Sequence, residues 1–567
     1  MTALRGLRPL RASGRACSSA VLGWVTSVFA TVVAAATRLI GLGHPSTLMF
    51  DEIYYAKDGW SLWHVGYEAT WAKNSDAAFA SGDVSSLTTQ AAYVVHPPLG
   101  KWLIGLGEVI VGPGNAVGWR IVPAIAGILT VLILCRVTMR LTRSPLLTLL
   151  AGFFLAIDGV GISESRIALL DVFISLFATA ALYFLVRDHE DQLTGMSRKD
   201  EPARRRVRPW LVMTGVSIGL ACSVKWSGLY LLAAVGLLVA AWDLSAIRRA
   251  GGMRSRVHSA ARVLVGDFLR LVPVAAVVYV GSWWSWFAHA GAWKHGWAAG
   301  LRAQGQAVPR AWLPDSVNDF IAYHQEAYSF HVALDSPHPY MSHPVGWLLQ
   351  WRPTNFYWVD QNPAAAGSCG AARCVAQVNS IGTVPLWWAA IPALVIVVVL
   401  AWVRRDWRAW VPLIGYVGLY LPWFLYPRRT IFTFYTVAFE PMVMLTLALA
   451  LGVLSGTLPS IRRSGSADEL GEAPLGQDDR RAPDRGPIAV YLGFDGLRPV
   501  KPSPSRAGLW KAFTGVEPWR LRREGLVLIA MVLALAIAFD VLWWPLWTGQ
   551  LISYDFWLWH MWLPSWI

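Results

Sequence analysis

The sequence predicts an all-α protein that crosses a membrane many times. Hydrophobic residues make up 55% of the 567-residue chain, and charged residues make up only 15%. Apolar runs of about 20 residues, enough to cross ~30 Å of hydrocarbon, recur along most of the chain. The 33 tryptophans are typical of aromatic belts at membrane–water interfaces. The net charge of +14 does not indicate a nucleic-acid partner, because the basic residues fall in short loops between apolar runs.

Eleven apolar segments are predicted to span the membrane. They are 20–43, 118–139, 145–163, 166–187, 209–225, 226–242, 263–287, 384–403, 409–425, 431–455 and 525–545. The basic N-terminal RGLRPLRASGRA resembles the start of a signal peptide. The run that follows is long and has no convincing small-residue cleavage site, so we expect a retained first helix.

A further apolar segment, LGKWLIGLGEVIVG at 99–112, is short for a span and contains Lys101 and Glu108. If it crossed, the basic stretches RKDEPARRRVR and IRRAGGMRSR would move outside, against the positive-inside tendency. We therefore expect 99–112 to be a helix lying at the outer interface. This topology predicts a multi-pass protein of the cell membrane with a cytoplasmic N-terminus.

The topology divides the chain into three parts. Residues 1–455 form a transmembrane catalytic domain with external loops at 44–117 and 288–383. Residues 456–523, rich in Pro, Gly, Arg and Asp, are predicted to be a mobile cytoplasmic loop without chemistry of its own. Residues 524–567 supply the last span and an external tail.

The cysteines are too few for a disulfide scaffold, with one exception. Cys369 and Cys374, in SCGAARC, fall in the second external loop, where a short disulfide is allowed. The alternative is that both are unpaired small residues. Cys17, Cys135 and Cys222 are interpreted as packing residues of membrane helices.

Unusual polar residues gather in the loops and turns predicted to lie outside. These are Asp51 and Glu52 in MFDEIYYAKD, His96 and Lys101 in VVHPPLGKW, Glu164, Arg166 and Asp171 in SESRIALLD, Lys225 in SVKWSG, and Arg428 and Arg429 in YPRRT. Each has a structural explanation by itself. A cation can snorkel to headgroups, Asp51 can cap a helix, His96 can brace a turn, and Asp171 can be the buried partner of Arg166. The joint pattern favours function, because charges at the membrane are costly to hold.

These residue types suit group transfer from a lipid-linked sugar phosphate. Arg and Lys at the outer leaflet can bind a lipid phosphate, and the arginine fork matches phosphate oxygens. A carboxylate pair above them can deprotonate a hydroxyl nucleophile. The departing phosphate needs stabilisation of its charge more than it needs a proton.

The motifs FDE, VHPPLGK, SRIALLD, SVKWSG and PRRT followed by F and FY occur here in one order. In this respect the chain resembles the protein O-mannosyltransferases, membrane enzymes of the C-type glycosyltransferase fold. The resemblance covers nearly the whole chain. It implies transfer of mannose, with inversion, from a polyprenyl-phosphate-mannose donor to Ser or Thr of exported polypeptides. The secretion translocon is a further partner to be expected.

The resemblance also implies roles for individual residues. Asp51 is the general base, and Glu52 holds the acceptor or orients the site. Arg166 and Lys225 lie near the donor phosphate with Arg428 or Arg429, and His96 and Lys101 shape the floor of the site. Glu164 and Asp171 belong to the same substrate-binding turn.

The chain departs from eukaryotic members because loop 288–383 is too short for their β-trefoil domain. It resembles bacterial, actinobacterial members, whose endings are similar to WLWHMWLPSWI. The absent domain leaves acceptor recognition to the two external regions.

No metal motif stands out and no cofactor is required by this interpretation. A divalent ion held by Asp51 and Glu52 with Glu164 or Asp171 is a less favoured alternative. Two other functions stay open. One is the same chemistry with a lipid or glycan acceptor, and the other is a transporter or flippase. A transporter should place its charges at the bilayer midplane on broken helices, whereas here they gather at one interface.

Overall fold

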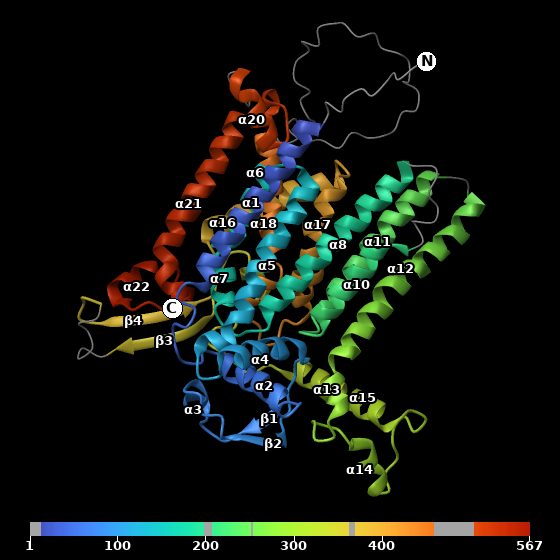
Figure 1. Cartoon of the computed structure of the whole chain (residues 1–567), viewed down its shortest axis with the longest axis vertical. Helices are drawn as coiled ribbons and strands as arrows, with labels where there is room; N and C mark the ends of the chain where they lie inside the picture. The colour runs from blue at the N-terminus through green and yellow to red at the C-terminus, as the bar shows by residue number, and fades with distance from the viewer. Residues whose placement is uncertain (1–12, 198–206, 251–252, 362–368, 459–503) are drawn as a thin grey trace, which may run out of the picture.

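The computed structural model describes residues 13–197, 207–250, 253–361, 369–458 and 504–567. Most of the predicted cytoplasmic loop 456–523 lies outside these residues, so its character stays a prediction. The described chain forms a bundle of long helices with smaller elements gathered at one end (Figure 1).

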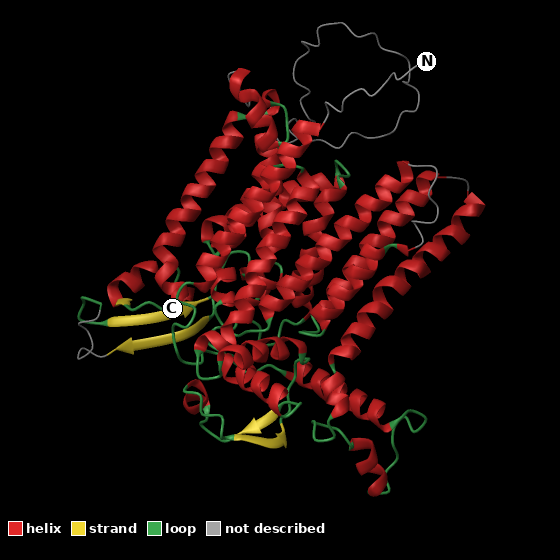
Figure 2. Cartoon of the chain, in the orientation of Figure 1, coloured by secondary structure: helices red, strands yellow, loops and turns green. Residues whose placement is uncertain are grey.

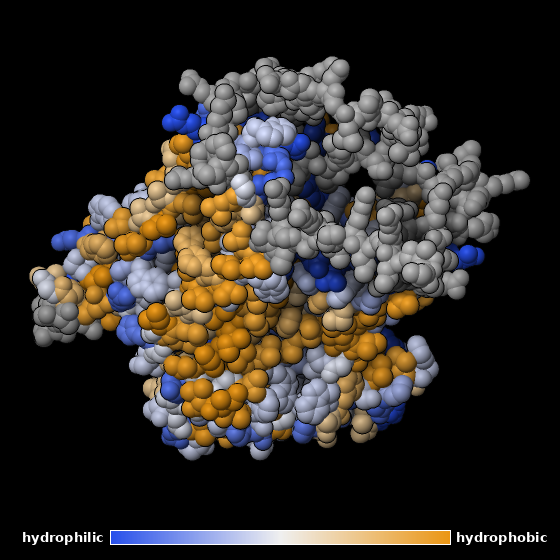
Figure 3. Space-filling view, turned by 45° about the horizontal axis from the view of Figure 1, so that its top comes forward, coloured by the Kyte–Doolittle hydropathy of each residue, from blue (hydrophilic) through white to orange (hydrophobic). Residues whose placement is uncertain are grey.

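Seven helices in the described part are long and apolar enough to span a membrane. They are α1 (Ser13–Leu39), α5 (Ala116–Thr142), α8 (Asp171–Ser197), α11 (Gly228–Ala250), α12 (Met253–Ser282), α16 (Val384–Trp402) and α21 (Arg523–Thr548). Figure 3 shows the apolar side chains as a broad band across one face, with hydrophilic residues on either side of it. The chain is a multi-pass membrane protein.

The other predicted spans are helical but interrupted or shorter. Helices α6 (Pro145–Ile157) and α7 (Gly159–Ser165) are bent by 55°, because Asp158 between them has extended backbone angles and caps α7. Helices α10 (Pro209–Cys222) and α18 (Glu440–Ser455) are apolar but short. Helix α17 (Trp407–Gly415) continues as π and 3-10 turns, η3 (Tyr416–Tyr420) and η4 (Leu421–Leu425). Seven spans, or eight with the bent pair, are supported by length, so eleven stays a prediction.

The first external region forms a layer at one end of the bundle. Helices α2 (Glu52–His64) and α4 (Leu99–Val111) lie there across the ends of the long helices (Figure 1). They pack closely, since a Cβ on Gly59 would lie 2.8 Å from the Gly105 nitrogen. A small antiparallel sheet of β1 (Ala69–Trp71) and β2 (Leu87–Ala91) flanks α3 (Asp76–Ala80). Helix α4 is only 13 residues long, and its place at the outer interface stays a prediction.

The second external region adds helices and a second sheet. Its elements are α13 (Trp284–Ala288), α14 (Trp297–Ala303), α15 (Asp315–Ala333), η1 (Pro344–Gly346), β3 (Asn355–Gln361) and β4 (Cys374–Asn379). The strand order is β3-β4-β5, with β5 (Ile552–Ser553) supplied by the C-terminal tail. Figure 2 shows how little of the molecule these strands occupy. The all-α prediction missed them because such short strands in loops have no periodic signal.

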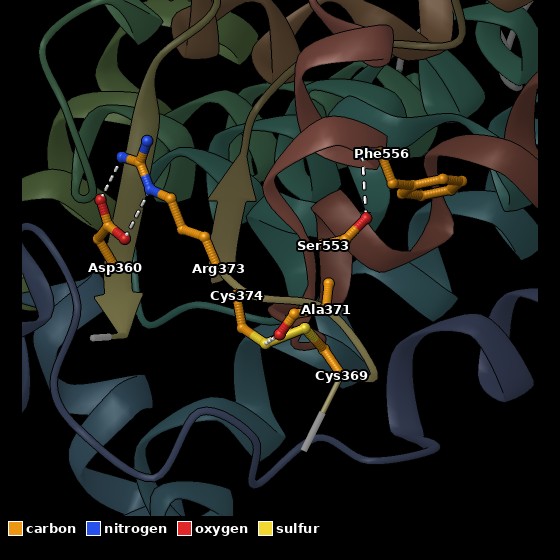
Figure 4. Close-up of a disulfide and its surroundings, with 7 residues drawn as sticks. All are labelled: Asp360, Cys369, Ala371, Arg373, Cys374, Ser553 and Phe556. Atoms are coloured by element: carbon orange, nitrogen blue, oxygen red, sulfur yellow. Dashed lines mark hydrogen bonds and ion pairs between the residues drawn. A yellow bond between two sulfur atoms is a disulfide. The ribbon is translucent and has the colours of Figure 1, made fainter. Parts of the chain in front are cut away.

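The predicted disulfide is confirmed. Cys369 and Cys374 are bonded, with their Cα atoms 6.1 Å apart, at the start of β4 (Figure 4). Cys135 and Cys222 are free and buried, as expected of packing residues.

The remaining elements complete the chain. They are η5 (Thr433–Ala438), α20 (Pro504–Thr514), η6 (Pro518–Arg520), α22 (Tyr554–His560) and η7 (Pro564–Trp566). The largest buried apolar cluster lies within the helix bundle and extends to the first external region.

Candidate active site

Asp51 is held at the N-terminus of α2 by an unusual backbone turn. Phe50, directly before it, has φ of 48°, in the left-handed region that non-glycine residues rarely adopt. The Phe50 ring packs against Phe356, Phe432 and Phe434 at centroid distances of 5.3, 6.0 and 5.7 Å. This packing stabilises the strained turn and thereby fixes the position of the carboxylate that follows.

The surroundings of Asp51 suit a general base. Burial raises the pKa of Asp51 to about 6, nearby Lys225 lowers it, and Asp171 raises it. The carboxylate makes no cap hydrogen bond to its own helix. A carboxylate with this pKa is ionised at neutral pH and is a better proton acceptor than an ordinary aspartate.

Lys225 is the cation beside this base. It lies in the turn between α10 and α11, where its Nζ is 2.6 Å from Asp171 Oδ2 and 5.0 Å from the Tyr435 ring centre. Asp171 therefore pairs with Lys225, and the alternative that it is the buried partner of Arg166 is wrong. Glu164 is buried on α7 and interacts electrostatically with Asp51, Asp171 and Lys225. Among the residues that the structure describes, neither Glu164 carboxylate oxygen has a hydrogen-bond partner.

Glu52 is bound by structural partners. Its two oxygens accept hydrogen bonds from Arg120 Nε and Nη2, each at 2.8 Å, and both side chains are fully buried. Glu52 also accepts from the backbone nitrogens of Met49 and Ala168, each at 2.8 Å. Of the two roles expected for Glu52, this geometry supports orienting the site and leaves no free oxygen to hold an acceptor.

Arg120, the partner of Glu52, was not among the residues expected at the site. It also donates to the backbone oxygens of Pro45 at 2.6 Å and Thr47 at 2.9 Å. Arg120 thus connects α5 to the turn that carries Asp51. An arginine inside the apolar run GWRIV was a usable signal, because charges in membrane segments are rare and need a partner.

Arg166 binds the end of α1, and its expected place near the donor phosphate stays a prediction. Its guanidinium donates to the backbone oxygens of Ile40 at 2.7 Å and Gly41 at 2.8 Å. These carbonyls lie just beyond the end of α1, where helix carbonyls lack partners within the helix. The cationic side chain satisfies them and interacts favourably with the negative end of the helix.

His96 and Lys101 are joined by a hydrogen bond, and their role in shaping the floor of the site stays a prediction. Lys101, only 1% exposed, is 2.5 Å from Glu68 and donates to the His96 backbone oxygen at 3.0 Å. The His96 ring lies 5.1 Å from that of His331 and 6.3 Å from that of Tyr55. Burial and nearby cations hold the pKa of His96 well below its usual range, so its ring is neutral.

The two neighbouring arginines of YPRRT differ. Arg429 donates to the His331 backbone oxygen at 3.1 Å and lies 5.6 Å from the Trp423 ring centre. It also acts electrostatically on His96, whereas Arg428 is exposed. Arg429 is therefore the better candidate for a phosphate contact. His331 and Tyr435, which the sequence analysis did not select, join this group through contacts that only the fold creates.

An apolar groove opens between residues of α2, α4, α10 and α12. It has a volume of about 600 Å³ and is lined by Trp63, Leu99, Trp102, Leu220, Val278, Ser282 and Trp284. The Leu99 nitrogen donates to the Ser223 oxygen at 3.2 Å, two residues before Lys225. One wall of the groove, at Leu99, thus contacts the turn that carries Lys225.

The acidic residues do not form an evident metal centre. Within the described residues, no group of three or more His, Cys, Asp and Glu side chains is arranged to hold a metal ion. Asp171 already pairs with Lys225, and Glu52 with Arg120.

Comparisons with known proteins show the family to which the chain belongs. Residues 28–289 match the family described as dolichyl-phosphate-mannose-protein mannosyltransferase. A polyprenol-phosphate-mannose–protein mannosyltransferase of Mycobacterium tuberculosis is 34% identical over 451 residues, which cover 76% of this chain and 81% of the relative. A protein of the same description from Corynebacterium glutamicum is 32% identical over 449 residues, covering 76% of this chain and 82% of the relative.

The fold is shared with a solved structure. The Saccharomyces cerevisiae protein O-mannosyltransferase Pmt1-Pmt2 complex, bound to the sugar donor, has a chain that superposes with a TM-score of 0.63 at 14% identity. The match covers 97% of this chain and 92% of that chain. The sequence relatives and the shared fold together define a membrane-embedded glycosyltransferase of the C-type fold. Within that class, the chain belongs to the protein O-mannosyltransferase family.

Proposed function

We propose that this enzyme transfers mannose from a polyprenyl-phosphate-mannose donor to Ser and Thr hydroxyls of exported polypeptides. The observation that carries the proposal is the placement of Asp51, whose pKa is raised to about 6, beside the cation Lys225. The turn that carries Lys225 contacts one wall of an apolar groove. The relatives named above carry the same donor and protein acceptor in their descriptions. The groove suits an apolar polyprenyl chain, and Lys225 with Arg429 suits the phosphate.

Asp51 and Lys225 have different roles in the proposed mannose transfer. Asp51 accepts the proton of the acceptor hydroxyl as the hydroxyl oxygen attacks the anomeric carbon. The bond between that carbon and the phosphate oxygen breaks, and polyprenyl phosphate departs with the electron pair. Lys225 stabilises the charge that develops on the phosphate. A single displacement of this kind inverts the anomeric carbon.

We place the reaction on the extracytoplasmic face of the cell membrane, with the N-terminus in the cytoplasm. The distribution of basic residues supports this orientation. Polypeptides emerging unfolded from the secretion translocon would be suitable acceptors, because their hydroxyls are still accessible. The proposed step needs no divalent metal, since Lys225 already supplies a positive charge at the phosphate. Full activity after treatment with a chelator is the expected result.

One assay tests the proposal against transfer to a lipid or glycan. The purified enzyme in vesicles receives radiolabelled polyprenyl-phosphate mannose and a Ser/Thr/Pro-rich peptide, with a hydroxyl-free Ala/Val version as the control. Label should enter the first peptide and not the second. Label that moves only into lipid or glycan would favour the alternative acceptor, and a labelled donor that merely changes leaflet would indicate a flippase.

A further inference from the structure

Strand β3 presents a free edge on the external side of the molecule. In the described part of the chain, β3 pairs only with β4, and the strand order is β3-β4-β5. Figure 1 shows β4 lying between β3 and helix α22, so the free edge of β3 is turned away from α22. An unpaired strand edge offers a row of N–H and C=O groups with which another extended chain can pair.

The edge is held rigidly in place. All six residues of β4, the strand behind it, are buried. Arg373, just before β4, donates to Asp360 of β3 at 3.1 and 2.5 Å, and Figure 4 shows this pair beside the disulfide of Cys369 and Cys374. On the same strand, Trp358 packs against Trp557 of α22 with ring centres 4.9 Å apart. A fixed edge loses little entropy when it binds a partner.

The start of β3 leads directly to the base. Phe356, its second residue, has its ring centre 5.3 Å from that of Phe50, and Phe50 immediately precedes Asp51. His338 flanks the Phe50 ring on another side, at 6.2 Å. A chain that follows the edge of β3 toward Asn355 therefore arrives at the residue next to Asp51.

We propose that the acceptor polypeptide binds as an added strand on the free edge of β3, along Asn355–Gln361. The acceptor Ser or Thr lies just beyond the part of the peptide that pairs with β3. From the Asn355 end of the strand, the peptide continues past Phe50 and places the hydroxyl at Asp51. The inference rests on the proposed function, because it assumes a polypeptide acceptor. Paired strands lie about 4.8 Å apart, so the added chain stays close to β3 along its whole length.

This mode of binding fits acceptors of varied sequence. Main-chain hydrogen bonds supply the affinity and are independent of the side chains, while exposed residues of the strand contact alternate side chains of the partner. Trp358, 38% exposed, and the half-buried Tyr357 are available for such contacts. Only an extended segment can pair in this way, so a hydroxyl within a folded helix is excluded.

Acceptor peptides with single N-methylated backbone amides test the pairing. In an added strand, alternate N–H groups face β3, and methylation removes the donor and adds bulk at each position. We expect the KM for peptide to rise about tenfold or more at every second position and to change little between them. The kcat and the KM for the donor should stay unchanged. Equal effects at all positions, or none, would overturn the proposal.

The unmethylated peptide separates this inference from the proposed function. If it receives no mannose, the polypeptide acceptor itself is refuted and the added strand falls with it. If it is mannosylated but methylation has no alternating effect, only the added strand is refuted.

A second measurement locates the bound peptide. A photoreactive residue is placed three residues from the acceptor Ser, and the crosslinked enzyme is reduced and digested with trypsin. Trypsin does not cut the Arg352–Pro353 bond, so β3 lies in the tryptic fragment 311–373. Sequencing of that fragment should place the crosslink within 355–361. A Trp358→Ala variant should weaken peptide binding, and Trp312→Ala, an 82% exposed tryptophan between α14 and α15, should not. Crosslinks confined to other fragments would place the acceptor elsewhere.

Discussion

The two adjacent carboxylates of FDE have opposite environments. Glu52 is fully buried against Arg120, and its two oxygens accept four hydrogen bonds from that arginine and two backbone nitrogens. Asp51 is partly buried, and its pKa is raised to about 6 beside Lys225 and Asp171. Successive residues at a helix start point in different directions, so one can anchor the turn while the other stays reactive.

Of the two neighbouring carboxylates, Glu52 has a structural role and Asp51 is available for the reaction. A buried, bidentate arginine–carboxylate pair is rigid and has no capacity left for a substrate. A carboxylate without such a partner keeps a higher pKa and a free lone pair. The anchoring pair therefore supplies the fixed geometry on which the base depends.

Substitution of Asp51, the reactive carboxylate, should have the largest effect on mannose transfer. Asp51→Asn keeps the shape of the side chain but cannot accept a proton, so transfer should fall by roughly 10²–10⁴-fold. The KM for the donor should change little, because the phosphate contacts lie on other residues. Radiolabel transfer and a separate donor-binding measurement check both parts. Near-normal turnover would remove Asp51 from the role of base.

Substitution of Glu52, the structural carboxylate, should lower the stability of the protein. Glu52→Gln leaves Arg120 buried beside a neutral partner, and breaking a buried ion pair costs about 3–5 kcal/mol. The variant should unfold at a clearly lower temperature in detergent and lose activity together with its fold. A charge-swapped or apolar replacement of both partners is the control. If Glu52→Gln were as stable as the parent enzyme but inactive, Glu52 would have a direct role in the reaction.

The cation beside the base should affect the donor. Lys225→Met removes the charge but keeps much of the apolar stem, and loss of a charged hydrogen bond costs about 1.5–3 kcal/mol, roughly 10- to 150-fold. The affinity for polyprenyl phosphate should fall by this amount, more steeply than the affinity for a neutral polyprenol. Arg166→Met is the matched control, because Arg166 contacts the end of α1, and it should lower stability without selective loss of phosphate binding. Equal losses in both variants would contradict this division.

These assignments also show what the sequence could predict. Its apolar runs and motif order were sufficient for a multi-pass membrane fold, for the family and for the disulfide of Cys369 and Cys374. They could not predict that Arg166 binds the carbonyls at the end of α1 while Lys225 pairs with Asp171. Either cation could have paired with Asp171, and only the packing of the helices decides which one does. The same limit applies to Arg120 and His331, whose contacts join segments far apart in the chain. Strands β3 and β4 were missed since short strands in loops lack periodicity.

The pH dependence of transfer should follow the reactive carboxylate. Because protonated Asp51 cannot accept a proton, kcat should fall as the pH drops through the pKa of about 6, by about tenfold at pH 5. The same profile measured on Lys225→Met should shift to higher pH, because Lys225 lowers the pKa of Asp51. Profiles from single-turnover experiments separate this step from product release. A flat profile between pH 5 and 7, or no shift in the variant, would contradict the placement of Lys225 beside the base.

The smallest effect separates two neighbouring arginines. Arg429 is held against His331 and Trp423 near the charged group, so Arg429→Ala should weaken donor binding several-fold by removing one cation close to the phosphate. Arg428 is exposed, and charges separated from the site by solvent are screened at physiological salt, so Arg428→Ala should change donor binding by less than about twofold. Donor titrations at low and high salt distinguish the two, because only the effect of Arg429→Ala should persist at high salt. If Arg428→Ala were the more damaging change, the phosphate would lie on the exposed side of this turn, away from Lys225.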